Sequence, residues 1–70
     1  MLEFRLKGRE YVELKNLLKL LNLVNSGGEA KMIIQGGEVI VNNEVETRRG
    51  RKLKVDDKVS YLEKTIKILS

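Results

Sequence analysis

The order of apolar and polar positions predicts a short strand followed by a helix. Residues 2–7, "LEFRLK", alternate apolar and charged side chains, which is the period of a half-buried strand, and Gly8 ends it. From about Tyr11 onward, leucines recur at the spacing of one helical face, at Leu14, Leu17, Leu18 and Leu21. This pattern lasts about two heptads, too few for a leucine zipper, so it predicts an amphipathic helix packed on a core.

A second helix has recognisable start and stop signals. Ser26, followed three residues later by Glu29, fits a capping box in which each side chain accepts a hydrogen bond from the other residue's amide. Gly36 or Gly37 can take the positive φ that ends a helix. The buried face of this helix is predicted to comprise Ala30, Ile33 and Ile34.

The remaining sequence predicts short strands joined by turns. Val39 and Val41 alternate with Glu38, Ile40 and Asn42, and "NN" at 42–43 can close a two-residue hairpin. "DDK" is a second turn candidate, and "VSYLE" and "TIKIL" indicate two more strands. With no internal repeat or linker, residues 1–70 are expected to form a single α+β domain. Its two helices would pack on a small, mostly antiparallel sheet that the N-terminal strand could join.

Composition narrows the function classes. The chain has 70 residues and neither cysteine nor histidine, which removes thiolate nucleophiles, disulfides, imidazole bases and the usual zinc sites. Asp56 and Asp57 are adjacent carboxylates, but they are more simply turn formers than an acid–base pair. We therefore expect no catalytic residues, no metal and no cofactor. The N-terminus resembles neither a signal peptide nor a membrane span, so we expect a cytoplasmic protein with no membrane partner.

The charge is concentrated in one place. The net charge is +4, and five basic residues fall within a window of seven: Arg48, Arg49, Arg51, Lys52 and Lys54. These cations repel one another, and a polyanion would relieve that repulsion. Gly50 lets the backbone turn sharply or approach a ligand closely. The alternative interpretation is a solvated edge that discourages aggregation between sheets.

A second candidate anion site is the start of the second helix. Gly27 and Gly28 follow Ser26, and small residues allow a phosphate to approach the free amides of a helix N-terminus. The two glycines are equally consistent with a loosely formed first turn. Lys31 is predicted to lie on the exposed side of the same helix.

The ordered set of these features resembles a known family. The segment from "LKNLLKLL" to "VDDKV" is similar to the RNA-binding domain named after the small-subunit ribosomal protein S-four, also called the alpha-L motif. The corresponding features are the helical leucines, Ser26 with Ala30, Gly37, "VIVNN" and "VDDKV". "SGGEAK" together with "RRGRKL" is most similar to the free-standing, single-domain bacterial members labelled YaaA-like. The resemblance covers about residues 12–60.

Three positions depart from the family pattern. Gly27 stands where an arginine usually follows the helix-starting serine, which removes one expected phosphate contact. Asn43 replaces the glycine of "VNG", and Asp56 replaces the glycine of a "GD" pair. Asp56 with Asp57 makes nucleic acid contact at that end of the sheet less favourable.

The resemblance implies binding to structured RNA, with ribosomal RNA or an assembling ribosomal particle as the expected partner and transfer RNA as an alternative. A monomer is expected, as is recognition by shape and backbone, because only Phe4, Tyr11 and Tyr61 could stack on bases. The competing hypothesis is a protein-interaction adaptor on a ribosomal or replication partner, with the basic run as a solvated edge. The predicted RNA-binding residues are Ser26, Gly27, Gly28, Lys31, Arg48, Arg49, Arg51, Lys52 and Lys54.

Overall fold

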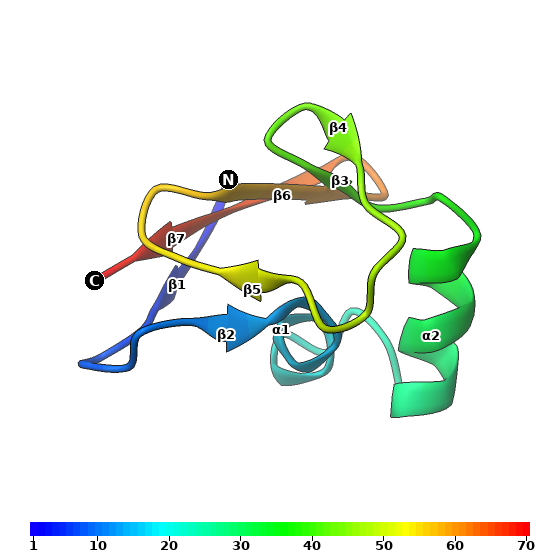
Figure 1. Cartoon of the computed structure of the whole chain (residues 1–70), viewed down its shortest axis with the longest axis horizontal. Helices are drawn as coiled ribbons and strands as arrows, with labels where there is room; N and C mark the ends of the chain where they lie inside the picture. Colours follow the sequence, from blue (N-terminus) through cyan, green and yellow to red (C-terminus); the bar gives the residue numbers. More distant parts are fainter.

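The computed structural model describes residues 1–70 as two helices and two small sheets (Figure 1). This is the predicted α+β architecture, which is confirmed. In chain order the elements are β1 (Leu2–Arg5), β2 (Val12–Glu13), α1 (Leu14–Leu20), α2 (Gly27–Gln35), β3 (Ile40–Val41), β4 (Glu44–Val45), β5 (Lys52–Leu53), β6 (Lys58–Tyr61) and β7 (Lys64–Leu69).

The main sheet has five strands in the order β1-β7-β6-β3-β4. Three of its pairings are antiparallel, whereas β1 lies parallel to β7, with Leu2 opposite Ile66 and Phe4 opposite Ile68. The N-terminal strand therefore forms one edge of the sheet and lies beside the C-terminal strand.

The second sheet was not predicted. Val12 pairs with Leu53 and Glu13 with Lys52 in a short antiparallel ribbon, β2–β5. The first helix consequently begins at Leu14, and the expectation that it starts near Tyr11 is wrong. Val12 is buried at 5% exposure, and its pairing with a distant strand outweighs the local helical pattern.

The core collects most of the predicted apolar faces, although Leu21 and Ile33 are only partly buried. α1 buries Leu14, Leu17 and Leu18, and α2 buries Ala30 and Ile34. The strands add alternating residues, namely Val39, Val41, Val59, Tyr61, Ile66 and Ile68. Burial raises the pKa of the Tyr61 phenol, and the nearby charges of Glu38 and Glu29 act in the same direction. Neither helix is both long enough and apolar enough to cross a bilayer.

The caps of α2 follow the prediction with one change. Ser26 Oγ accepts a hydrogen bond from the Glu29 amide at 3.2 Å, as expected. The Glu29 carboxylate accepts from the Asn25 amide at 2.9 Å, one residue earlier than the capping box predicts. Of the two glycines that could end the helix, Gly37 has the positive φ, +80°. The local signals therefore place both ends of α2 within a residue.

The predicted turns are also present. Asn42 and Asn43 both have positive φ, 52° and 71°, in the hairpin between β3 and β4. The Asn42 side chain donates to Asp57 Oδ1 at 2.9 Å and accepts from the Lys58 amide at 2.9 Å. Asn43 forms no side-chain hydrogen bond, so its only structural demand is a left-handed backbone.

This difference between the two asparagines yields a stability prediction. Replacing Asn43 with glycine should raise the free energy of unfolding by up to about 1 kcal/mol, because glycine adopts positive φ without a steric cost. Asn42→Gly is the matched control, since it relieves the same backbone conformation but removes two hydrogen bonds. Urea unfolding should show a higher midpoint for Asn43→Gly and no increase for Asn42→Gly. Equal increases for both would contradict the role assigned to the Asn42 side chain.

Candidate nucleic-acid interface

The basic run is part of the folded framework. After β4 the chain passes α2, reaches the start of α1 and then enters β5 (Figure 1). The Leu14 amide donates to the Arg51 carbonyl at 2.9 Å, and the Lys15 amide donates to the Arg49 carbonyl at 3.1 Å. Glu13, the N-cap residue of α1, forms no side-chain cap. Carbonyls of the basic run therefore satisfy amides that a helix start would otherwise leave free.

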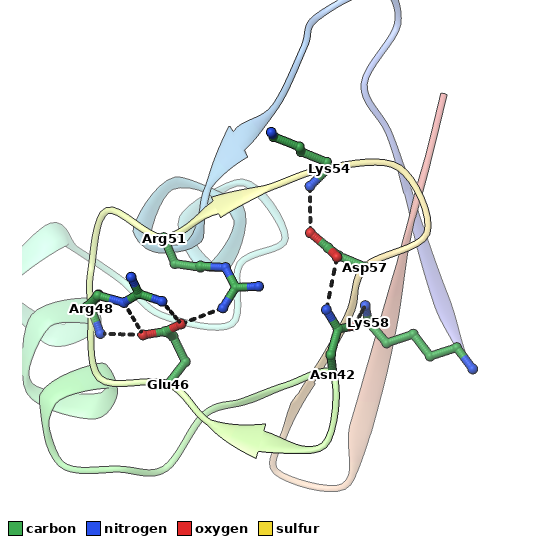
Figure 2. Close-up of polar contacts among 7 residues, drawn as sticks. All are labelled: Asn42, Glu46, Arg48, Arg51, Lys54, Asp57 and Lys58. Carbon is green, nitrogen blue, oxygen red and sulfur yellow. Dashed lines mark hydrogen bonds and ion pairs between the residues drawn. The ribbon is translucent and has the colours of Figure 1, made fainter.

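A buried carboxylate fixes two of the arginines. Glu46 is only 6% exposed, and Arg48 donates to it through its amide at 3.0 Å, through Nε at 2.9 Å and through Nη2 at 3.0 Å. Arg51 Nη1 donates to the same carboxylate at 2.7 Å. Figure 2 shows both guanidinium groups converging on Glu46. Glu46 was not among the residues singled out from the sequence, and only the structure shows it as a buried carboxylate at the centre of the basic run.

These contacts keep Glu46 ionised. The hydrogen bonds from the Arg48 side chain are the largest cause of a lowered pKa, which falls from the ordinary 4.5 to about 2, although burial acts in the opposite direction. Arg51 lowers the pKa further. The same pairing raises the pKa of Arg48. Glu46 and Arg48 are therefore both charged across the physiological pH range.

The pairing leaves much of the arginine surface available. The Arg48 side chain remains 72% exposed and that of Arg51 29% exposed. A guanidinium has five N–H donors, of which Glu46 engages two on Arg48 and one on Arg51. The remaining donors can contact a second anion while Glu46 holds the planar groups in place.

Four of the five clustered cations line one surface hollow. This basic hollow has a volume of about 800 Å³, and its lining is Arg48, Gly50, Arg51, Lys52, Lys54, Val55 and Asp57. The Asp57 carboxylate accepts from the Lys54 amide at 2.7 Å and from Asn42 Nδ2 at 2.9 Å (Figure 2). Asp57 is thus a turn former whose oxygens are engaged, and the cations around the hollow outnumber it four to one.

The other predicted residues lie outside the basic hollow. Arg49 and Lys31 are exposed, and neither lines the hollow. The α2 start is exposed as well, but Ser26 Oγ is engaged as the cap and the acidic Glu29 side chain occupies the same turn. The structure thus brings Arg48, Arg51, Lys52 and Lys54 together. It leaves the α2 residues as a separate prediction.

Sequence reasoning missed Glu46 and underrated Tyr11. Lys52 Nζ lies 5.1 Å from the centroid of the Tyr11 ring, a cation–π contact across the β2–β5 ribbon. The one signal for Glu46 in the sequence was an acid placed two residues before Arg48. In the structure the apolar Val45 is 61% exposed and the charged Glu46 is buried, which is the reverse of what their polarity predicts. Periodicity alone does not reveal such a reversal, because it depends on tertiary contacts.

A family model described as the S4 domain matches residues 4–69. The chain belongs to the S4 domain family. The match extends beyond the predicted 12–60 and includes the second half of β1 and all of β7.

Two relatives have informative names. The chain is 48% identical over 50 residues to the "Probable ribosome maturation protein RlbA" of Bacillus subtilis, covering 71% of this chain and 70% of that one. It is 36% identical over 70 residues to YbcJ of Escherichia coli, covering all of both. The solution structure of YbcJ, described as revealing an alpha-L motif involved in RNA binding, has a TM-score of 0.76 and covers 100% of this chain and 89% of that one.

Two departures from the S4 family pattern now have a backbone explanation. Asn43 and Asp56 replace family glycines, and their φ angles are 71° and 76°. Asparagine and aspartate are the non-glycine residues that tolerate this region best. The substitutions therefore keep the S4 turns while adding polar side chains.

The Glu46 cluster gives a pH-dependent prediction. Glu46→Gln keeps the side-chain size but removes the charge, and should lower the free energy of unfolding at neutral pH by about 1–3 kcal/mol. Because the folded-state pKa is lowered, the charge stabilises the fold above the ordinary 4.5, and this contribution is lost as pH falls toward about 2. Urea unfolding of both proteins should therefore show a gap that is constant above about pH 5 and closes on acidification.

Glu44→Gln is the matched control. The Glu44 side chain is exposed and forms no hydrogen bond or ion pair, so its replacement should change stability by less than about 0.5 kcal/mol. A difference between wild type and Glu46→Gln that does not depend on pH would contradict the ionised, arginine-bound carboxylate.

Proposed function

We propose that this protein is a non-catalytic, single-domain module that docks on structured RNA through the basic hollow. Ribosomal RNA, free or in an assembling ribosomal particle, is the proposed target, with transfer RNA as the alternative, and the protein acts as a cytoplasmic monomer. Membership of the S4 domain family supports RNA as the ligand. The descriptions of two relatives point the same way: one is named a probable ribosome maturation protein, and the structure of the other is described as having a motif involved in RNA binding.

The single observation that carries the proposal is the fixed pair of arginines at the rim of the basic hollow. Arginine presents a planar fork that matches two phosphate oxygens, and Glu46 holds both forks in place before any ligand arrives. Less side-chain entropy is then lost on binding. Lys52 and Lys54 add two further positive charges to the same hollow. This arrangement suits the phosphate backbone of a folded RNA better than it suits a small substrate.

The protein-adaptor alternative has one structural observation in its favour. Ile40 and Val45 face each other across β3 and β4 and are 38% and 61% exposed. An apolar cross-strand pair near the edge of a sheet is a plausible contact for another protein. Under this alternative, Ile40→Ser with Val45→Thr would abolish partner binding, whereas neutralising the basic hollow would not.

Salt dependence tests the RNA proposal. Contact with about five phosphates predicts a log–log salt slope of about −3.5 to −4.5 for a structured ribosomal RNA fragment. Replacing Lys52 and Lys54 with glutamine should weaken binding and reduce the magnitude of the salt slope by about 1.4–1.8. The reason is that two fewer phosphates are neutralised, so fewer counterions are released on binding. Lysines are the better targets, since Arg48 and Arg51 also stabilise Glu46.

The matched control neutralises Lys7 and Lys64, which carry the same total charge and do not line the basic hollow. It should leave the slope close to the wild-type value. Equal losses in both double variants would mean that net charge, and not the hollow, determines binding. Length-matched duplex DNA in the same titration distinguishes an RNA module from a general polyanion binder.

A further inference from the structure

A second hollow is lined by β2, whereas the basic hollow is lined by β5 of the same ribbon. This second hollow has a volume of about 750 Å³ and is formed by the segment before β2 and by one face of α1. We call it the aromatic hollow, and the lining residues that matter here are Arg9, Glu10, Tyr11, Glu13, Lys19 and Leu20. Tyr11 is 38% exposed and Leu20 57% exposed. The hollow therefore offers an aromatic ring and an aliphatic side chain to solvent at the same place.

The two hollows meet at one residue. Lys52 lines the basic hollow, and its Nζ lies 5.1 Å from the Tyr11 ring centroid. Its backbone pairs with Glu13, which lines the aromatic hollow. A ligand in the basic hollow that contacts Lys52 is thus separated from Tyr11 only by the Lys52 side chain.

The charges of the two hollows differ. The aromatic hollow has two cations, Arg9 and Lys19, and two carboxylates, Glu10 and Glu13. The basic hollow has four cations and one carboxylate. Phosphate groups should therefore favour the basic hollow, and the aromatic hollow suits a group that is flat, neutral and polar at its edges. A nucleobase has these properties.

Tyr11 is the one aromatic side chain placed for this role. Tyr61 is buried at 7% exposure, and Phe4 packs against the core with Arg9 over its ring. Lys52 lies over the Tyr11 ring, so a base would stack on the opposite face. The expectation of recognition by shape and backbone was based on the small number of aromatic residues. The position of Tyr11, exposed and lining a hollow, favours base stacking instead.

We infer that the aromatic hollow binds one unpaired RNA nucleotide, whose base stacks on Tyr11 while the flanking phosphates occupy the basic hollow. This inference rests on the proposed RNA-binding function and makes it more specific. The preferred ligand is a structured RNA that carries a bulged or looped-out base beside a helical segment. Such bases are available for stacking, whereas the bases of a continuous helix are not.

The test uses two RNA hairpins that differ by one nucleotide. One has a continuous stem, and the other carries a single bulged 2-aminopurine in the same stem. Stacking on one aromatic side chain predicts that wild type binds the bulged hairpin about five- to a hundred-fold more tightly. The fluorescence of the bulged base should be quenched on binding.

Substitutions at Tyr11 separate stacking from charge. Tyr11→Phe keeps the ring and should keep both the preference and the quenching, whereas Tyr11→Ser should reduce the affinity ratio to about one. Leu20→Gln is a second variant that lies on the surface of α1 and should reduce the ratio as well. Leu62→Asn, at an exposed residue that does not line this hollow, is the control and should leave the ratio unchanged.

The outcomes distinguish this inference from the function on which it rests. If wild type and Tyr11→Ser bind both hairpins equally, with a steep salt slope, the nucleotide site is refuted and the RNA-binding proposal stands. If neither hairpin binds, both proposals fail. A bulge preference that persists in Tyr11→Ser and Leu20→Gln would place the unpaired base elsewhere and overturn the assignment.

Discussion

The carboxylate of Glu46 is the constraint on which the candidate interface depends. A buried carboxylate is costly unless it is paired and hydrogen-bonded, and Glu46 satisfies that requirement with Arg48 and Arg51 from the segment that follows it. These bonds fold the chain back on itself and fix the path of residues 46–51. That path in turn supplies the carbonyls that cap α1 and delivers Lys52 and Leu53 to β2. A single ionic cluster thus links the start of α1, the small ribbon and the rim of the basic hollow.

The size of the chain explains why its chemistry lies on the surface. The 15 buried apolar residues form one cluster, and a domain of 70 residues has little volume left for an enclosed site. Both hollows are therefore surface features, one lined by β2 and the other by β5. Because this ribbon is paired and its inner residues are buried, the side chains at its edges keep fixed relative positions. A surface site can be preorganised without a deep core when its backbone is held in this way.

Membership of the S4 domain family accounts for the scaffold, and particular residues account for its differences from the family pattern. The two substituted glycines keep their left-handed conformation as Asn43 and Asp56. Gly27 stands at the position after the helix-starting serine where the family usually has an arginine, and Glu29 places an acid in the same turn. The positive charge of this chain is concentrated instead between residues 48 and 54. The candidate interface is correspondingly centred on the basic hollow and not on the start of α2.

The sequence by itself determined the elements whose causes are local. The Ser26 cap, the turn at Asn42 and Asn43, the leucine stripe of α1 and the alternation of Val39 and Val41 at the start of the main sheet's first hairpin all depend on residues within a few positions of one another. Only the tertiary structure decided the pairing of Val12 with Leu53, the burial of Glu46 and the exposure of Tyr11 beside Lys52. Each of these depends on which distant segments come together. The periodicity of one segment does not show which distant segment it will contact. It indicates which face is buried, but not what covers that face.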